Sequence, residues 1–510
     1  MTARHFILFV VLALSAWGTP HVARAAESAP AAKKRGVLAT IESARKALQA
    51  GRFQEGADAI GEVMQMPELA EAASSLQFQV LVLGAAADLG REDSLGAHEY
   101  MAMATEFPQA TAIHWLMRAQ YAAWVDDWAD AAIATTAVAK RWPKAIATGD
   151  SQLISRVGFR ANDDGKHRSE QLELLNALFA ANFTLQLGLQ PDGLWQELIV
   201  DALDRNDLPR AREISKRVQN TETLVQMRID RRFDVLVRAE PKVFDITAAL
   251  NYQRKLLAKA VSADPRSMTA RVQYGYTLQE AGRFEELLAL TNEVIARVAA
   301  APADSPPYDD GADKLNWIYN HKASSLRAMG HWEDALTVLE AGNHQQENGA
   351  INVSQRINLG AAYLEIGRAQ KALEALDGID WAHSLSPYGR MQLQHVRYCA
   401  YLQLGNTREA DNVLAYLREH HDDAESTWQE AMIDAGDLDG AAALLIARLH
   451  DPDQRSAALG EVQDYKPLPH APKRPQTEAR WDALIARPDV AAAINAVGRR
   501  EKIPLYAVHN

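Results

Sequence analysis

The stretch INLGAAYLEIGRAQKALEALDGI (Ile357–Ile379) decides the fold. Its apolar residues recur from Leu359 to Ile366 at steps of three and four, which marks one face of a helix. Gly367 follows as a helix-ending residue, since glycine enters the left-handed region without a side-chain penalty. The helical period resumes at Ala372. Two helices joined this tightly must run antiparallel, and a small residue at 372 lets them approach closely.

The same helix–turn–helix pattern recurs along the chain. Neighbouring turns lie 31 residues apart at the shortest (Gly405 to Gly436) and 48 at the longest (Gly282 to Gly330) where the series is unbroken. Internal repeats of this period indicate a solenoid. We anchor the turns at Gly51, Gly90, Asp126, Asn206, Gly282, Gly330, Gly367, Gly405 and Gly436.

These units resemble tetratricopeptide repeats. The segment HWLMRAQYAAWVDDWADAAIATTAVAKRWP (114–143) places large, small and turn-flanking residues where that family has them: Trp115, Ala119, Trp128, Ala131 and Pro143. The units around Gly282, Gly330 and Gly367 match as well. Gly56 and Leu287 depart from the usual alanine, and Asp126 and Asn206 from the usual glycine. The resemblance implies an all-α, right-handed α-solenoid of antiparallel helix pairs, a tetratricopeptide-like superhelix.

The repeats and their punctuation suggest a domain order. We expect a signal peptide at 1–25, a flexible lead-in at 26–36 and N-terminal repeats at 37–265 that diverge in 144–190 and 215–265. C-terminal repeats at 266–463, a Pro-rich connector at 464–476 and closing helices at 477–510 follow. We expect no strands.

The N-terminus has the features of an export signal. Arg4 precedes the apolar run FILFVVLALSAW, and Ala23 and Ala25 fit a small-residue cleavage site, so cleavage is expected between Ala25 and Ala26. The run is short for a membrane span, which needs about 20 residues. The sequence therefore predicts a periplasmic protein with no stable membrane span after cleavage; a secreted protein and a retained anchor are the alternatives.

Charge and cysteine content exclude several classes. The formal net charge is −12, which disfavours nucleic acid as a partner because phosphate binding needs a basic face. Cys399 is the single cysteine, so no disulfide forms within one chain. Its apolar helical context favours a packing role over a nucleophilic one.

Motifs of catalysis and metal binding are missing from the sequence. It has no H-E-x-x-H, G-x-S-x-G, Walker A or C-x-x-C pattern. The run REHHDD (418–423) carries His420 and His421, but adjacent helical residues point about 100° apart, so we interpret it as a solvated helix end. We expect no enzyme, no catalytic residue, no metal and no cofactor.

Two sets of residues are candidates for partner binding. The first helices of a tetratricopeptide array line its concave groove, with ordinary solvated residues as the alternative to ligand contacts. Registration on the turn glycines places these residues there: Tyr276, Asn320, His321, Arg327, Asn358 and His395. Asn358 matches a position of the family's carboxylate clamp, although the Lys and Arg partners of that clamp are missing. The second set is an arginine cluster suited to anion capture, with internal salt bridges as its alternative: Arg228, Arg231 and Arg232.

The resemblance implies a non-catalytic scaffold or adaptor that binds a protein or extended peptide, in cell-envelope assembly or secretion. Two alternatives stay open. One is an enzyme, or an enzyme's regulatory subunit, whose site is built from scattered residues. The other is a glycan-binding solenoid that uses some of the 11 Trp residues as stacking platforms.

Overall fold

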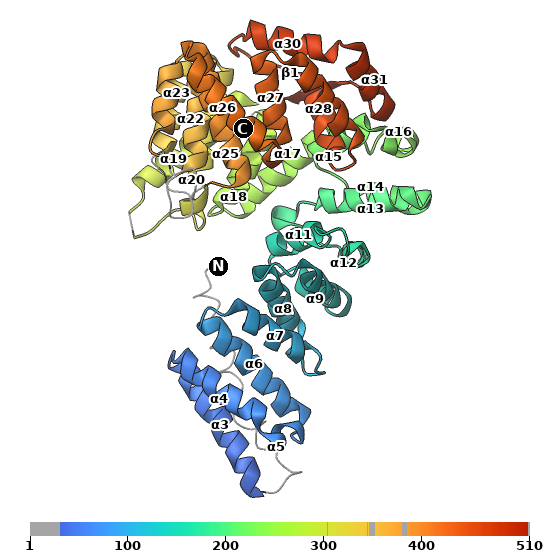
Figure 1. Ribbon diagram of the computed structural model, residues 1–510, viewed down its shortest axis with the longest axis vertical. Helices are drawn as coiled ribbons and strands as arrows, with labels where there is room; N and C mark the ends of the chain where they lie inside the picture. The colour runs from blue at the N-terminus through green and yellow to red at the C-terminus, as the bar shows by residue number, and fades with distance from the viewer. Residues whose placement is uncertain (1–30, 303, 344, 346–351, 380–384, 508–510) are drawn as a thin grey trace. The chain divides into compact units, whose positions relative to one another are not determined.

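A computed structural model describes residues 31–507 apart from 303, 344, 346–351 and 380–384 (Figure 1). The chain separates into two compact units, Met1–Asp201 (unit 1) and Ala202–Asn510 (unit 2). The expected signal peptide at 1–25 lies outside the described residues. The sequence predicts a boundary at residue 265, where the match to the repeat pattern improves. The two units of the structure are instead separated by where contacts within the chain are sparse.

Unit 1 is a series of helix pairs joined by short turns. Its apolar residues face the partner helix, and small residues such as Ala97, Ala131 and Ala132 are fully buried where paired helices meet. The elements are α3 (Ala31–Gln49), α4 (Phe53–Gln65), α5 (Pro67–Ala70), α6 (Ser74–Gly90), α7 (Ser94–Thr105), α8 (Ala112–Trp124), α9 (Trp128–Arg141), α10 (Pro143–Ile146), α11 (Ser151–Arg160), α12 (Arg168–Ala180), η1 (Gln186–Gly188) and α13 (Asp192–Asp204), which crosses the unit boundary.

Unit 2 continues the pairs and ends in a segment of different character. The elements up to the last pair are α14 (Leu208–Ser215), α15 (Thr221–Ile229), η2 (Arg231–Phe233), α16 (Asp234–Ala239), α17 (Ile246–Ala263), α18 (Met268–Glu280), α19 (Phe284–Ala300), α20 (Gly311–Ala328), α21 (Trp332–Asn343), α22 (Val353–Glu365), α23 (Ala369–Leu376), α25 (Pro387–Leu404), α26 (Thr407–Glu419), η3 (His421–Asp423), α27 (Glu425–Ala435) and α28 (Leu438–His450). The elements after it are α29 (Arg455–Glu461), β1 (Asp464–Lys466), α30 (Pro475–Ile485), α31 (Pro488–Val497) and β2 (Lys502–Tyr506).

The turns within the pairs share one conformation. A residue with positive φ is followed by the N-cap, and the second helix starts at the next residue. Gly367 has φ 74°, and Asp126 and Asn206, which replace glycine, reach φ 58° each. Asn and Asp tolerate this region better than other side chains do, because their short polar groups bond locally.

One turn differs from the expected register. Gly90 is the last residue of α6, and the left-handed residue is Glu92, with φ 64°. Gly90 is needed for packing instead, since a Cβ there would lie 2.1 Å from Cδ1 of Phe53. The anchor of this repeat therefore shifts by two residues.

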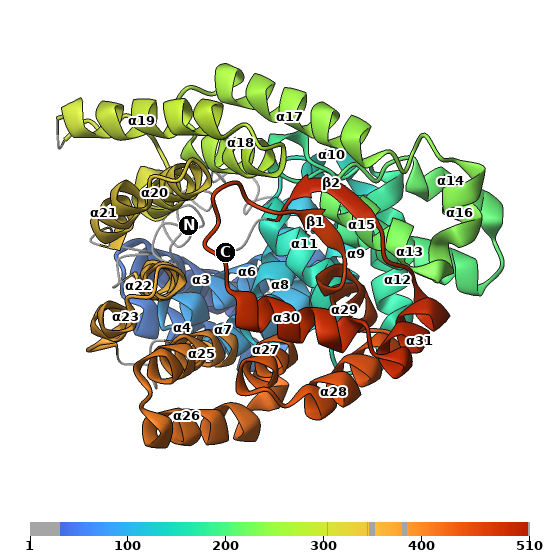
Figure 2. The ribbon, with the colours of Figure 1, turned by 90° about the horizontal axis from the view of Figure 1, so that it is seen from above.

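Unit 2 has inner and outer helices. Figure 2 shows α18, α20, α22, α25 and α27 on the inside of a curve, with α19, α21, α23, α26 and α28 outside them. We call the first set the inner helices and the second set the outer helices. As the sequence predicted, the architecture is all-α and built from antiparallel helix pairs.

The two ends of unit 2 pack together. A single apolar cluster contains Val225 and Ile229 of α15 together with Leu459 of α29 and Ile494 of α31. Polar contacts reinforce it: Arg499 donates its backbone N–H to the Ile229 carbonyl at 2.9 Å. The array therefore closes on itself in this unit.

A small parallel pair, β1 with β2, forms where none was expected. It aligns Asp464 with Lys502 and Tyr465 with Ile503. Ile503 and Leu505 are buried in the same apolar cluster, which explains why this short stretch is extended and ordered. We call residues 464–507 the C-terminal segment.

Among the described residues, no helix combines the length and the apolar character that crossing a bilayer requires.

Candidate functional site

The inner helices bring two predicted groove residues together. Asn320 of α20 and Asn358 of α22 occupy neighbouring helices, and the Asn358 Nδ2 donates to the Asn320 Oδ1 at 3.4 Å. Asn320 is buried, with 8% of its surface exposed, and Asn358 is half-buried. Each amide keeps further donor and acceptor positions beyond this one long hydrogen bond.

Two other predicted groove residues form a packing contact. The rings of Tyr276 and His321 meet edge to face with centroids 4.5 Å apart. His321 is buried, and its Nε2 lies 3.0 Å from the Val272 carbonyl oxygen. Burial lowers the pKa of His321 to about 4 and raises that of Tyr276. This imidazole therefore belongs to the contact between α18 and α20 and is neutral at pH 7.

Arg327 is held by its neighbours. Its Nη2 donates to both carboxylate oxygens of Glu365, at 2.6 and 2.8 Å, and its guanidinium lies 5.3 Å from the ring centroid of Trp332. The pair joins α20 to α22. A charge-neutralised arginine of this kind orders the inner face and offers little free charge to a ligand.

The predicted arginine cluster is engaged within unit 2. Arg228 pairs with Glu501 at 2.6 Å, and Arg231 Nε donates to the Asn495 carbonyl at 2.8 Å. Arg232 contacts the fully buried Asp230 at 2.7 Å. Two of the three arginines thus hold the C-terminal segment.

The C-terminal segment runs along the turns of the array. Tyr506 packs against Gly282, where an added Cβ would lie 2.2 Å from its ring. Trp332 Nε1 donates to the His470 carbonyl at 3.3 Å, beside the turn at Gly330. Arg480 Nη1 donates to backbone carbonyls at the end of α27. The segment therefore braces the turn edge at α18, α20 and α27.

The sixth predicted groove residue, His395 of α25, lies in a polar cluster that spans two inner helices. Its Nε2 is 3.2 Å from the Asp434 Oδ2 of α27 and 3.5 Å from the Cys399 Sγ. The Cys399 Sγ is 3.3 Å from the same Asp434 oxygen. All three side chains are largely buried. In the described part of the chain, this is the group of His, Cys and carboxylate side chains whose spacing suits a metal ion.

Charge within the cluster is balanced by close pairing. Burial alone would lower the pKa of His395. The neighbouring Cys399 sulfur and Asp434 carboxylate outweigh burial and raise this pKa to well above its ordinary value. Burial raises the pKa of Asp434, but the hydrogen bond and charge of His395 bring it below its ordinary value. The imidazolium and carboxylate forms therefore support each other.

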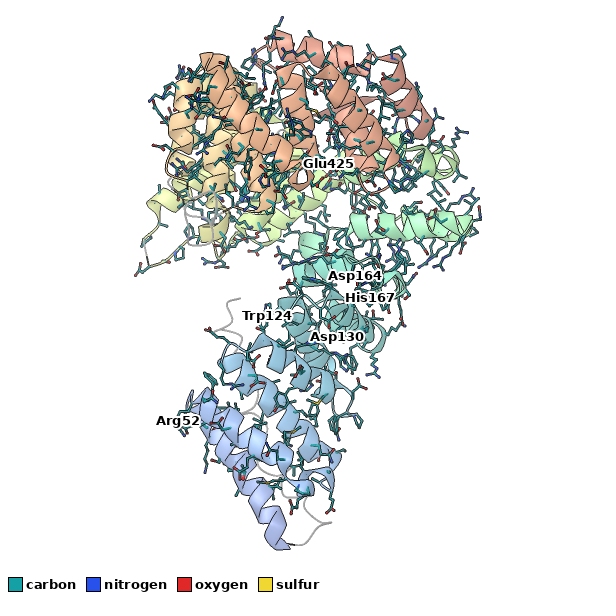
Figure 3. All side chains as sticks on the ribbon, viewed as in Figure 1. Arg52, Trp124, Asp130, Asp164, His167 and Glu425 are labelled. Atoms are coloured by element: carbon teal, nitrogen blue, oxygen red, sulfur yellow. The ribbon has the colours of Figure 1, made fainter. Side chains whose placement is uncertain are left out.

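Unit 1 has its own buried ionic cluster, which is structural. Arg118 of α8 contacts both carboxylate oxygens of Asp130 at 2.5 and 2.8 Å, and His98 Nε2 lies 2.9 Å from Asp130. Asp130 is labelled in Figure 3. Burial raises the pKa of Asp130, yet these bonds lower it to about 2. Since every group is paired, the cluster joins α7, α8 and α9 and presents no reactive atom.

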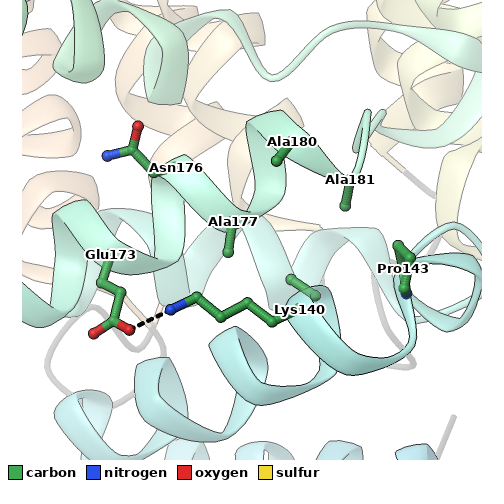
Figure 4. A pocket seen from close by; sticks show the side chains of 8 residues that line it. Lys140, Pro143, Glu173, Asn176, Ala177, Ala180 and Ala181 are labelled. Atoms are coloured by element: carbon green, nitrogen blue, oxygen red, sulfur yellow. Dashed lines mark hydrogen bonds and ion pairs between the residues drawn. The ribbon is translucent and has the colours of Figure 1, made fainter.

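Two other surface features carry no site. A hollow of about 600 Å³ lies between α9 and α12, lined by alanines and bridged by Lys140 and Glu173 at 2.5 Å (Figure 4). At the expected solvated helix end, His420 lies 3.6 Å from Asp423 and His421 lies 2.9 Å from Asp422.

Sequence reasoning missed Asp434 and the link of His395 to Cys399. His395 and Cys399 are four residues apart on one helix, a spacing that places both on one face and was available from the sequence. Asp434 follows 35 residues later, and only the packing of α27 on α25 brings it to them.

No protein-family model matches the chain, and no curated protein sequence matches it. Three solved structures show a likeness in fold. The anaphase-promoting-complex hetero-tetramer Cut9–Hcn1 is 12% identical over 92% of this chain and 86% of that one, with a TM-score of 0.30. A Rap protein in complex with competence and sporulation factor is 11% identical over 89% and 99%, with a TM-score of 0.29. The tetratricopeptide domain of P58(IPK) is 13% identical over 81% and 99%, with a TM-score of 0.18.

TM-scores this low carry no argument, so the fold assignment stands on the chain's own geometry. Antiparallel pairs, left-handed turn residues and buried alanines at the helix contacts recur in both units. Each unit is an all-α array of tetratricopeptide-like helix pairs.

Proposed function

We propose that this chain is a non-catalytic scaffold that binds an extended protein segment on the inner helices of unit 2. The observation that carries the proposal is the pair of amides, Asn320 and Asn358, at neighbouring positions on α20 and α22. A side-chain amide both donates and accepts, so it can bond the N–H and C=O groups of an extended backbone. Because the two amides lie on successive inner helices, they provide donors and acceptors at two positions along the array.

The course of the C-terminal segment supports the same region. It lies against the turns at Gly282, Gly330 and Gly436. At Gly367 and Gly405, by contrast, no described atom comes within 4 Å of an added Cβ. Within the described residues, the turns at Gly367 and Gly405 are thus left uncovered by the C-terminal segment. Asn358 lies on α22, the helix that leads into the turn at Gly367.

The test is capture of partners from the native host with the full chain and with the double variant Asn320→Ala and Asn358→Ala. We expect recovery of the partner to fall by about tenfold, which corresponds to about 1.4 kcal/mol. The matched control is Asn292→Ala with Asn412→Ala, which removes exposed amides from the outer helices α19 and α26. Equal recovery by both double variants, with both folded, would refute the proposal.

Export to the periplasm is a proposal that rests on the sequence of residues 1–25 alone. Intact-mass measurement of the protein from its native host should give Ala26 as the first residue. A product that retains Met1 would remove the assignment. A role in envelope assembly or secretion is proposed from the resemblance to tetratricopeptide arrays, and the identity of the captured partner tests it.

A further inference from the structure

We propose that His395, Cys399 and Asp434 form a binding site for a divalent metal ion of the zinc class, set between two inner helices of unit 2. This inference is independent of partner binding. It concerns three donor atoms that converge: an imidazole Nε2, a thiol Sγ and a carboxylate Oδ2, all within 4.8 Å of one another.

The helices explain the convergence. His395 and Cys399 are separated by one helical turn on α25, so their side chains leave the same face. Asp434 is next to the C-terminal end of α27, which packs on that face, and Glu430 lies one turn before it. The two helices therefore present His and Cys from one side and two carboxylates from the other.

The distances match those of a tetrahedral site. Zinc binds nitrogen, oxygen and thiolate sulfur at about 2.0–2.3 Å, so tetrahedral angles place neighbouring donors about 3.3–3.6 Å apart. The three separations here are 3.2 Å (Nε2 to Oδ2), 3.5 Å (Nε2 to Sγ) and 3.3 Å (Sγ to Oδ2). A metal ion would fit with side-chain movements of a few tenths of an ångström. The mixed N, S and O donor set favours zinc over the hard cations calcium and magnesium.

Outer groups hold the ligands in place. The Glu430 Oε2 lies 3.6 Å from the His395 Nδ1, the ring nitrogen opposite the cluster. The other oxygen of Asp434 accepts from Thr477 Oγ1 at 3.0 Å, with Arg474 at 3.7 Å. Carboxylates behind a ligating histidine, and bonds to the free oxygen of a ligating carboxylate, are the usual supports of such sites.

The site is enclosed but can be reached. The side chains of His395 and Asp434 are 14% and 9% exposed, whereas that of Glu430 is 61% exposed. The cluster is therefore close to solvent on the side of Glu430. Three protein ligands leave a fourth position for water or for a group of a bound molecule.

A cysteine nucleophile is the competing chemistry. In a Cys–His–acid triad the acid bonds the ring nitrogen that faces away from the sulfur. Here Glu430 lies 3.6 Å from that nitrogen, Nδ1, which is beyond hydrogen-bond distance. Asp434 instead contacts the sulfur itself and the ring nitrogen that faces it, Nε2. A carboxylate so placed opposes formation of a thiolate by charge repulsion, but it completes a cation site. The geometry favours the ion.

The experiment uses the full chain, stripped with a chelator and a reductant, and titrated with zinc alone by calorimetry. We expect saturable binding of one ion per chain and a higher melting temperature with zinc. Cobalt as a probe should produce a thiolate-to-metal absorption band in the near ultraviolet, which requires the one cysteine of this chain to be a ligand.

Variants assign the ligands. Cys399→Ser should abolish the cobalt–thiolate band, and Asp434→Asn should weaken zinc binding at least tenfold. Glu430→Gln should weaken it about 10–100-fold while the band is retained, as a positioning residue would. The control, His420→Gln with His421→Gln, removes the exposed His–Asp pairs and should change neither readout.

Several results would overturn the proposal. One is a wild-type chain that is folded and shows neither zinc binding nor a cobalt–thiolate band. Another is loss of zinc binding in the His420/His421 control with retention in Cys399→Ser. A third is rapid alkylation of Cys399 by iodoacetamide that saturating zinc does not slow, which would favour the nucleophile.

Discussion

Gly275 in α18 tests how closely the inner helices approach each other. A Cβ at this position would lie 2.6 Å from Cδ2 and 2.8 Å from Nε2 of His321 on α20. Relaxed carbon contacts are about 3.5–4.0 Å, so Gly275→Ala must displace a buried ring by about 1 Å. That displacement threatens the contact between Nε2 and the Val272 carbonyl oxygen at 3.0 Å.

The magnitude follows from three contributions. Overpacking costs about 1–3 kcal/mol, and a lost hydrogen bond costs about 1 kcal/mol. Alanine's higher helix propensity returns up to about 1 kcal/mol. We expect Gly275→Ala to lower the free energy of unfolding by about 1–3 kcal/mol, measured as a shift in the urea midpoint.

Gly61→Ala is the matched control. Gly61 also lies within a helix, α4, and nothing comes within 4 Å of an added Cβ there. This variant should therefore be stabilised by up to about 1 kcal/mol. If the two variants shift alike, the close contact of α18 with α20 is refuted.

Two more predictions concern the core and pH. Ala372→Arg should lower the free energy of unfolding by about 3–5 kcal/mol, because residue 372 is fully buried between paired helices. Gln370→Arg, on the exposed side of α23, should leave the melting temperature nearly unchanged. Equal melting temperatures of the two variants would contradict the repeat register. Burial raises the pKa of Glu280 to about 7, while its hydrogen bond from Thr221 lowers it and the charge of Glu222 raises it. A raised carboxyl pKa means that the folded state keeps its proton to higher pH, so this group's stabilising contribution is lost as pH rises from about 4.5 to about 7. Relative to wild type, the free energy of unfolding of Glu280→Gln should therefore rise by up to about 3 kcal/mol between about pH 5 and about pH 8. A difference in urea midpoints that does not change with pH would contradict a raised pKa at Glu280.

The helix pairs were predictable because their determinants are local. Apolar spacing and a turn residue lie within one repeat, so even Asp126 and Asn206 marked turns without glycine. Gly90 misled the register because its packing against Phe53 depends on a helix 37 residues away. A glycine needed for close approach and a glycine needed for positive φ look alike in a sequence.

The C-terminal segment was beyond such reasoning. Its strands pair over 38 residues, from Asp464 to Lys502, and its anchors Arg228 and Glu501 are 273 residues apart. The same limit hid the partner of His395. The groove register identified the histidine by its place on α25, but Asp434 joins it only through the stacking of a later repeat.

Site-specific photo-crosslinking in the native host tests the central claim most directly. A photoreactive amino acid replaces Asn358 on the inner helix α22 in one strain and Asn412 on the outer helix α26 in another. We predict a discrete crosslinked protein from position 358 that is missing from position 412. Crosslinks from position 412 alone, in a chain that remains folded, would contradict the assignment of the inner helices as the binding face.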